Sequence, residues 1–275
     1  MVAPLPHGDP AMSTNTNPRT HTCSALILAA GKGTRMKSDL PKVMHPALGR
    51  PMVEWVVDAA RAVGCTPVVL VIGHGAEIVR AHFDHRAGTE FVMQMPQLGT
   101  GHAADMARPL FERGQLGDEV LVLCGDGPLI RAETLRILLD THRSSGAAAT
   151  LATAVIPDPQ GYGRIQRDAH GNFARIVEQK DATPEQLGIR EINPSYYCFR
   201  TADLFDALRR VTNQNASGEY YLTDVFELLL RDGKRVSVVD AVPAEDVLSV
   251  NTPEQLAEVT RILQSRSARP TGAMA

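Results

Sequence analysis

The sequence predicts an α/β domain in which helices cover both faces of a mostly parallel sheet. The first observation is that short apolar runs alternate along the chain with amphipathic helical patterns. The second is that these runs are continuous, as in SALILAA at 24–30 and EVLVLC at 119–124. Strands with continuous apolar runs are buried on both faces, which is typical of parallel sheets packed between helices.

The first half of the chain predicts four strands, each followed by a helix. The helix at 51–63 shows how the assignment is made, because Met52, Val56 and Ala59 recur at helical spacing and Gly64 stands where a glycine ends a helix. The expected strands and their helices, in chain order, are 24–30 and 51–63, 67–72 and 76–83, 90–94 and 101–111, and 119–124 and 132–142.

The second half predicts antiparallel pairing. The turn at 168–171 indicates a hairpin between two strands. The last helix begins after Thr252, with Pro253 at its first position and Gln255 completing a capping box. The other expected elements are strands at 148–155, 163–167, 172–179, 191–200 and 235–241, and helices at 201–211 and about 219–231.

Composition and charge exclude several classes of protein. The chain has 275 residues, of which 44% are hydrophobic and 21% are charged, as in an ordinary globular protein. A net charge of −3 gives no basic footprint for nucleic acid, and no apolar run reaches the roughly 18–20 residues of a membrane span. We therefore expect no nucleic-acid and no membrane partner. Four widely spaced cysteines favour reduced thiols in a cytoplasmic protein over disulfides or zinc.

We expect one domain, at 23–266, between two disordered tails. Residues 1–22 are rich in Pro, Thr and Asn and lack the apolar core of a signal peptide. Residues 267–275 form the second predicted tail. The sequence leaves the oligomeric state unknown.

A phosphate-binding loop follows the first predicted strand. It has the sequence LAAGKGTRM at 28–36 and continues to Pro41 and Lys42. Glycines let the backbone approach closely, so that successive N–H groups can surround phosphate oxygens. Arg35 and Lys42 are two of several cations in this loop that would compensate a triphosphate. Neither a Walker A loop nor a dinucleotide fingerprint is present, because the spacing of the glycines fits neither motif.

The loop resembles the signature of sugar-1-phosphate nucleotidyltransferases, and five further blocks narrow the resemblance to the uridyltransferase domain of the bacterial N-acetylglucosamine-1-phosphate uridyltransferase family. The blocks are QMPQLGTGHA at 94–103, GDGPL at 125–129, GYGR at 161–164, IVEQKDA at 176–182 with EIN at 191–193, and GEYYLTD at 218–224 with VN at 250–251. The resemblance covers about residues 24–264.

The resemblance implies both a fold and a reaction. The fold is a doubly wound, Rossmann-like α/β nucleotidyltransferase domain, and we assign sugar binding to its antiparallel part. The reaction joins UTP and N-acetylglucosamine 1-phosphate, with Mg²⁺, to give UDP-N-acetylglucosamine and pyrophosphate. This product is a cell wall precursor.

The catalytic and metal-binding residues follow from the matched blocks. Asp126 stands after a predicted strand, and Mg²⁺ is usually held by one or two carboxylates together with substrate phosphates. The resemblance makes Asp126 and Asn251 the metal-holding pair. We assign catalysis to Asp126, to Arg35, which would stabilise the charge of the leaving pyrophosphate, and to Lys42, which would hold phosphate charge.

The resemblance also assigns the residues that bind the two substrates. Gln94 matches a uracil-reading position, and its amide offers both a donor and an acceptor. The nucleotide-binding residues are Leu28, Ala29, Ala30, Gly31, Lys42, Gln94, Gly99 and Thr100. The sugar-binding residues are Gly125, Gly163, Glu178 and Asn193.

The match departs from the family at two places beside the sugar site. Cys124 stands where many relatives have Tyr, and Pro194 and Ser195 stand where they usually have Thr-Gly. One alternative is therefore a uridyltransferase for another sugar 1-phosphate, such as that of glucose or galactosamine. A second alternative is a catalytically silent module that binds sugar nucleotides. A glycosyltransferase would want an Asp-x-Asp metal motif, which the sequence lacks.

One domain of the bifunctional family members is expected to be missing. The stretch after Asn251 contains no hexapeptide repeat. We therefore expect this chain to lack the acetyltransferase β-helix, either as a monofunctional enzyme or as a truncated chain.

Overall fold

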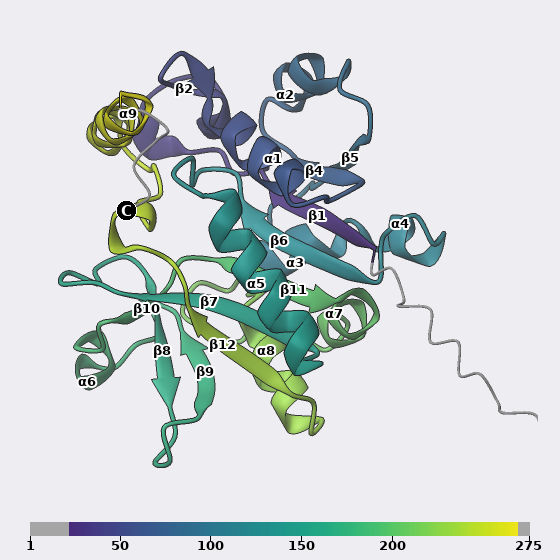
Figure 1. Cartoon of the computed structure of the whole chain (residues 1–275), viewed down its shortest axis with the longest axis vertical. Coiled ribbons are helices and arrows are strands. Elements are labelled where there is room, and N and C mark those ends of the chain that lie inside the picture. The colour runs from purple at the N-terminus through teal and green to yellow at the C-terminus, as the bar shows by residue number, and fades with distance from the viewer. Residues whose placement is uncertain (1–21, 269–275) are drawn as a thin grey trace, which may run out of the picture.

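The computed structural model describes residues 22–268, in which helices pack on both faces of one large sheet (Figure 1). The two predicted tails lie almost entirely outside the described residues. At the C-terminal boundary, the last helix continues to Ser267, one residue past the predicted end of the domain.

Four parallel strands form one half of the sheet. They are β1 (Cys23–Leu28), β4 (Val68–Ile72), β5 (Thr89–Met93) and β6 (Glu119–Cys124), in the order β5-β4-β1-β6. The parallel half that the sequence predicts is confirmed. Because the four strands run in the same direction, the loops that follow them meet at one edge of the sheet.

The other half of the sheet is mostly antiparallel, as predicted. Its strands are β7 (Ala149–Val155), β8 (Gly163–Arg167), β9 (Phe173–Val177), β10 (Glu191–Asn193), β11 (Tyr196–Arg200) and β12 (Val236–Asp240). β11 joins the halves, because it pairs antiparallel with both β6 and β7. From β7 the sheet continues through β10 and β8 to β9, and β12 pairs parallel with β7.

The prediction of a single strand at 191–200 is wrong, because the structure has two strands there. Pro194 has no N–H to donate, and Ser195 has φ +66°, in the left-handed region. The chain therefore turns between β10, which pairs with β7 and β8, and β11, which pairs with β6 and β7.

Helices cover both faces of the sheet. One face carries α1 (Met52–Ala62), α2 (Ala76–Phe83) and α5 (Ala132–Ser145), and the other carries α3 (Thr100–Asp105), α4 (Arg108–Glu112), α7 (Thr201–Leu208) and α8 (Asp224–Arg231). The side chains of β1 alternate between the two cores. Ala25 and Ile27 pack with α1 and α5, whereas Leu26 packs with α7 and α8. The fold class predicted from the sequence is confirmed.

Two helices differ from their predicted bounds. The helix predicted at 101–111 is divided into α3 and α4, with Pro109 in the first turn of α4. The helix predicted from residue 219 begins only at Asp224. Short elements that the sequence analysis did not predict are η1 (Thr34–Met36), η2 (Lys42–Met44), β2 (Pro46–Ala47), β3 (Arg50–Pro51), α6 (Pro184–Leu187) and η3 (Ala244–Asp246).

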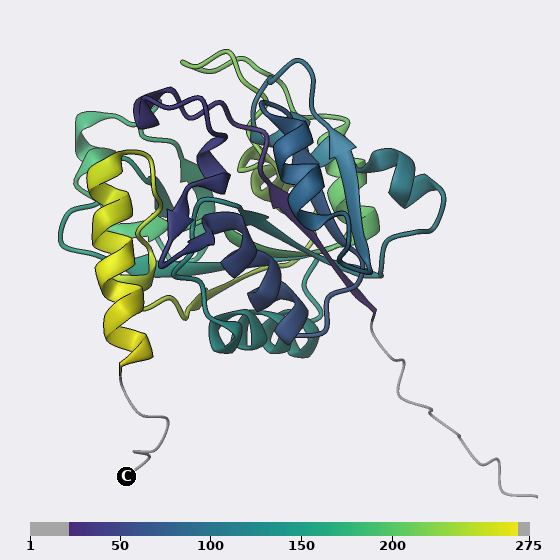
Figure 2. The same cartoon turned by 90° about the horizontal axis from the view of Figure 1, so that it is seen from above.

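The last helix, α9 (Pro253–Ser267), is fixed at both ends. Its predicted capping box is confirmed, because the hydroxyl of Thr252 accepts from the backbone N–H of Gln255 and the Gln255 side chain accepts in return. At the other end Arg266 donates to the carbonyl of Leu129 at 3.0 Å and to the carboxylate of Asp246. Seen from above, the yellow helix α9 stands at one side of the molecule (Figure 2). No helix within residues 22–268 combines the length and the apolar character that crossing a bilayer requires.

Candidate active site

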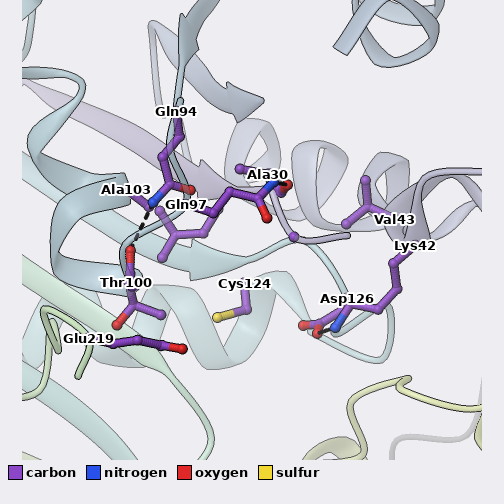
Figure 3. Close-up of a pocket in the computed structure, with 13 residues that line it drawn as sticks. Ala30, Lys42, Val43, Gln94, Gln97, Thr100, Ala103, Cys124, Asp126 and Glu219 are labelled. Atoms are coloured by element: carbon purple, nitrogen blue, oxygen red, sulfur yellow. Dashed lines mark hydrogen bonds and ion pairs between the residues drawn. The ribbon is translucent and has the colours of Figure 1, made fainter. Parts of the chain in front are cut away.

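A cavity of about 310 Å³ lies at the edge of the sheet where β1 and β6 end (Figure 3). Its walls come from the loop after β1, from η2, from the loop between β5 and α3, and from the loop after β6. The residues that line it are Leu28, Ala30, Gly31, Lys42, Val43, Gln94, Gln97, Gly99, Thr100, Ala103, Cys124, Asp126 and Glu219.

Two glutamines form one end of this cavity (Figure 3). The side-chain amide of Gln94 donates to the carbonyl of Gly99 at 2.9 Å and lies 3.1 Å from Nδ1 of His102. The amide of Gln97 donates to the carbonyl of Ala30. These bonds hold the loop after β5 against the loop after β1, so that two predicted nucleotide-binding segments face the same space.

Gly99 holds the loop between β5 and α3 in place through a close backbone contact. It has φ +114°, and a Cβ there would lie only 2.6 Å from the carbonyl oxygen of Tyr220. The hydroxyl of Thr100 accepts from the backbone N–H of Leu222 at 3.0 Å. The segment before α8 therefore packs against this loop and bonds it, which explains why α8 begins later than predicted.

Lys42 and Asp126 line the other end of the cavity, where they form a polar corner together with Arg35 and Asn251, which lie beyond the lining. The ammonium group of Lys42 bonds the carboxylate of Asp126 and donates to Oδ1 of Asn251 at 3.1 Å. Arg35 donates to the same Oδ1 at 2.9 Å. In Figure 3, Lys42 and Asp126 lie at the opposite end from Gln94 and Gln97. The four residues predicted for catalysis and metal binding thus lie together.

Asp126 and Asn251 fit a magnesium ion in the chemistry of their side chains. A carboxylate and an amide oxygen are hard ligands of the kind that Mg²⁺ prefers. Both oxygens already converge on one cationic group, the ammonium of Lys42. The backbone N–H of Val250 donates to the carbonyl of Asp126 at 2.9 Å, which fixes the spacing of the two loops. Within residues 22–268 there is no group of three or more His, Cys, Asp or Glu side chains that could hold a metal ion. A metal ion at Asp126 and Asn251 would therefore take its other ligands from substrate phosphates.

A smaller cavity of about 130 Å³ adjoins the first and shares Leu28, Thr100 and Cys124 with it. Its further walls are Glu178, Ser195, Tyr197, Leu222 and Thr223. The hydroxyl of Thr223 donates to the carboxylate of Glu178 at 2.9 Å. Burial raises the pKa of Glu178, and the nearby carboxylates of Asp181 and Asp224 raise it further, although the bond from Thr223 lowers it.

Four of the predicted binding residues lie behind the cavity walls. Ala29 is buried in the core. A Cβ at Gly125 would lie 3.2 Å from the carbonyl oxygen of Leu28, and one at Gly163 would lie 2.9 Å from the side chain of Ile176. Asn193 is only 5% exposed. These four residues therefore support the walls. The predicted residues that do line the cavities are Leu28, Ala30, Gly31, Lys42, Gln94, Gly99, Thr100, Asp126 and Glu178.

Several polar residues of the cavities were not predicted from the sequence. Gln97, Glu219 and Thr223 lie inside the matched blocks, so their positions in these motifs were a signal that could have found them. Tyr197 was predicted only as part of a strand. It is a wall of the smaller cavity, and its hydroxyl accepts from the side-chain amide of Asn193.

Comparison with known proteins identifies the domain. Residues 25–227 match the MobA-like NTP transferase domain. The bifunctional protein GlmU of Geobacter metallireducens is 51% identical over 249 residues, which cover 90% of this chain and 51% of that protein. The bifunctional protein GlmU of Pelobacter propionicus is 47% identical over 246 residues, which cover 90% of this chain and 53% of that protein. The chain spans about half the length of the curated relatives it matches, and the predicted resemblance to one part of a bifunctional enzyme is confirmed.

The fold is also similar to that of a solved structure. UDP-glucose pyrophosphorylase complexed with UDP-glucose superposes with a TM-score of 0.72 at 16% identity, over 89% of this chain and 99% of that one. This likeness shows the fold alone. The match over residues 25–227 runs from within β1 to within α8 and contains every lining residue of both cavities. The chain therefore belongs to the MobA-like NTP transferase domain family.

Proposed function

We propose that the chain is a sugar-1-phosphate uridyltransferase that makes UDP-N-acetylglucosamine and pyrophosphate from UTP and N-acetylglucosamine 1-phosphate. The observation that carries the proposal is the convergence of Arg35, Lys42, Asp126 and Asn251 at one end of a cavity whose other end holds Gln94. A nucleotide with its base beside Gln94 would direct its phosphates toward this polar corner. The smaller cavity beside Cys124 would then take the sugar.

The reaction needs positioning and charge more than proton transfer. A phosphate oxygen of the sugar phosphate attacks the α-phosphorus of UTP, a new P–O bond forms, and the bond to the β-phosphate breaks in line as pyrophosphate leaves. Lys42 and Arg35 would neutralise phosphate charge where it accumulates. Their side chains are held beside Asp126 and Asn251, so both cations are already at the polar corner, and Lys42 would pass from Asp126 to a substrate phosphate when a metal binds there.

Asp126 and Asn251 are the residues that would hold Mg²⁺. When bound, the ion would supply further charge neutralisation to the phosphate oxygens of both substrates. Lys42 bonds both of these side chains and keeps them directed toward one point. The proposal places the reaction in the cytoplasm, because its substrates are charged metabolites that do not cross membranes unaided.

The test is pyrophosphate release from the purified chain with Mg²⁺ and crossed panels of nucleotides and sugar 1-phosphates. The nucleotides are UTP, CTP, dTTP and GTP, and the sugars include N-acetylglucosamine, glucose and galactosamine 1-phosphates. Release that requires UTP and N-acetylglucosamine 1-phosphate supports the proposal. Release with another sugar would retain the chemistry and change the substrate. Folded protein that binds UDP-sugar but releases no pyrophosphate would instead be a silent binding module.

A further inference from the structure

Asn251 ends a segment, residues 247–251, that has no regular secondary structure. The segment leads from η3 to α9 and passes beside the loop after β6, where the backbone N–H of Val250 donates to the carbonyl of Asp126 at 2.9 Å. A segment of this kind has no ladder of backbone hydrogen bonds to hold it. The position of Asn251 therefore depends on the individual bonds that are made along the segment.

The side-chain amide of Asn251 has a fixed orientation. Its Oδ1 accepts from Arg35 and Lys42, and both of these cations can only donate. Its Nδ2 donates to the hydroxyl of Ser249 at 3.4 Å, and its backbone N–H donates to the side chain of Gln255 at 2.7 Å. The amide oxygen thus faces the polar corner, and the path of the backbone before residue 251 determines where that oxygen lies.

Two tyrosines hold consecutive carbonyls at the start of this path. The hydroxyl of Tyr196 donates to the carbonyl of Asp246 at 3.3 Å, and the hydroxyl of Tyr162 donates to the carbonyl of Val247 at 3.1 Å. Burial raises the pKa of both phenols, so both stay protonated and able to donate at neutral pH. Tyr196 lies in β11 and Tyr162 in the loop between β7 and β8. The antiparallel half of the sheet therefore holds the segment that ends at Asn251.

Tyr162 also lies beside the smaller cavity. It precedes Gly163, the first residue of β8, where a Cβ would lie 3.5 Å from a carboxylate oxygen of Glu178. The carbonyl of Tyr162 accepts from the guanidinium of Arg164, a residue that is only 2% exposed. The backbone of Tyr162 is thus fixed on the side of Glu178, while its hydroxyl reaches the segment that carries Asn251.

We propose that Tyr162 positions Asn251 for metal binding, with Tyr196 as a second support. The hydroxyl of Tyr162 holds the carbonyl of Val247 and so sets the path of residues 248–251, on which the distance between the oxygens of Asn251 and Asp126 depends. Tyr162 is not among the residues that line either cavity, so it is a positioning residue that acts through Asn251. This inference rests on the proposed uridyltransferase function and deepens it.

The first test is Mn²⁺ binding to Tyr162→Phe in the presence of UDP-N-acetylglucosamine, followed by the electron paramagnetic resonance signal of the free ion. The variant keeps the ring and loses only the hydroxyl. The dissociation constant of Mn²⁺ rises about 10-fold, as is typical when a group that orients a metal ligand is removed. An unchanged constant in Tyr162→Phe would overturn the inference and leave the proposed function standing.

Turnover of Tyr162→Phe gives a second readout. At limiting Mg²⁺ the kcat falls about 10-fold, and excess Mg²⁺ restores most of it. The KM for N-acetylglucosamine 1-phosphate stays within about twofold of the wild-type value, because Glu178 is unchanged. A loss of kcat that excess Mg²⁺ does not restore would overturn the inference, since a general structural defect does not depend on the metal concentration.

Thr201→Val is the matched control. The hydroxyl of Thr201, a residue that is 2% exposed, donates to the carbonyl of Gly117 at 2.6 Å. Thr201 follows β11 directly, at the opposite end of that strand from Tyr196. The variant therefore loses the same kind of bond without touching residues 246–251, and its Mn²⁺ affinity stays within about twofold of the wild type. Equal weakening in Thr201→Val and Tyr162→Phe would overturn the proposal.

A double-mutant cycle with Asn251→Ala tests whether Tyr162 acts through Asn251. In the Asn251→Ala background, Tyr162→Phe changes Mn²⁺ binding and kcat by less than about twofold, because the residue that it positions is already gone. A full 10-fold further loss would show that Tyr162 acts elsewhere and would overturn the inference. If Tyr162→Phe folds poorly, Tyr196→Phe replaces it in the cycle, with a loss of Mn²⁺ affinity expected in the same direction.

The metal readout also separates this inference from the proposed function, because Mn²⁺ binding needs no turnover. A wild-type chain that binds Mn²⁺ through Asn251 but releases no pyrophosphate with any sugar would overturn the proposed function alone. A wild-type chain that releases pyrophosphate while Asn251→Ala binds Mn²⁺ normally would overturn this inference alone.

Discussion

Lys42 holds together the two side chains that are proposed to bind the metal. Its ammonium group and the carboxylate of Asp126 are 16% and 17% exposed, so solvent screens their attraction less than it screens a surface ion pair. Asn251 is in turn held by Arg35. Removing one of these groups therefore changes the orientation of the side chains that it bonds and leaves part of their charge uncompensated.

Asp126→Ala is expected to lower kcat by about 10²–10³, because one preorganised contact to developing charge is lost. Turnover is followed by pyrophosphate release, and the fold is checked by circular dichroism and the melting temperature. Asp140→Ala, which removes an exposed carboxylate from α5, is the control and keeps normal turnover. Near-normal turnover in Asp126→Ala would exclude Asp126 from the mechanism.

The pH dependence of sugar binding reports the state of Glu178. Its pKa lies above the usual value, first through burial and then through the carboxylates of Asp181, Asp224 and Glu219. A sugar hydroxyl needs the ionised, accepting form, so the KM for the sugar phosphate rises as pH falls toward that raised pKa. Glu178→Gln raises this KM at neutral pH and removes its acidic dependence, whereas the KM for UTP is unchanged.

Asp224 is the control for this pH experiment. Burial, with help from Glu227 and Asp181, raises the pKa of Asp224 to about 6, so this carboxylate also becomes protonated as the pH falls. The acidic rise of the sugar KM persists in Asp224→Asn if Glu178 causes it. A rise that disappears in Asp224→Asn but survives in Glu178→Gln would assign the effect to Asp224 instead.

The charged residues of the site could be predicted from the sequence, whereas the bonding partners of its hydroxyl groups could not. Arg35, Lys42 and Asp126 occur in short motifs whose residue types suit phosphate and metal. Thr223 and Tyr197 are ordinary hydroxyl residues, and their contribution depends on partners distant in the sequence, such as Glu178, which lies 45 positions from Thr223. No local pattern records such a pairing.

At the scale of elements, the loop between β5 and α3 depends on the segment that precedes α8. Gly101 donates to the carbonyl of Tyr220 at 2.7 Å, and Tyr220 donates to the carbonyl of Leu98 at 2.8 Å. Gly99 lies between these bonds, where no side chain fits. The end of the cavity at Gln94 is therefore shaped by two segments that hold each other.

Gly99→Ala is expected to raise the KM for UTP at least 10-fold, because the new Cβ would meet the backbone of Tyr220 and displace the loop that carries Gln94. Stability falls by about 1–3 kcal/mol. Gly114→Ala is the matched control, since Gly114 also has a positive φ, +65°, but a Cβ there meets nothing within 4 Å. An equal change of the KM in both variants would argue against the displacement of the loop.

The sequence predicted most elements, and it failed where pairing partners determine the outcome. Residues 191–200 have strand character throughout, so periodicity could not show that β10 and β11 pair with different strands. The Pro109 interruption was readable in principle, since a proline inside a helix lacks the N–H of the ladder. The late start of α8 could not be predicted from the sequence. It arises because the backbones of Tyr220 and Leu222 bond the loop after β5.

At the scale of the whole molecule, α9 packs against segments that lie far from it in the sequence. A small core packs α9 against α1 and the loop after β6, and includes Met52, Leu129 and Leu263. The buried carboxylate of Asp246, 1% exposed, is bonded by Arg131 before α5 and by Arg266 of α9. The sequence predicted the helix but not this role, because neither arginine lies near Asp246 in the chain.

Asp246→Ala is expected to lower the free energy of unfolding by about 2 kcal/mol, because two arginines lose a buried, charged partner. Urea denaturation measures the change. Glu245→Ala is the control, since Glu245 also bonds Arg131 but is 61% exposed in its side chain, and exposed pairs contribute only about 0–1 kcal/mol. A loss as large in Glu245→Ala as in Asp246→Ala would show that burial of the carboxylate is not the cause.

The bond between Arg35 and Asn251 spans 216 positions of the chain, and this span sets an order of events during synthesis. The ribosome releases the N-terminal residues first, at about 5–20 residues per second. All of the strands and Gln94 are synthesised before Asn251, so the end of the cavity at Gln94 can form while the polar corner still lacks one member. The polar corner is completed only after Asn251 has been added. Chains released by interrupted translation before residue 251 would therefore fold part of the nucleotide site without consuming UTP.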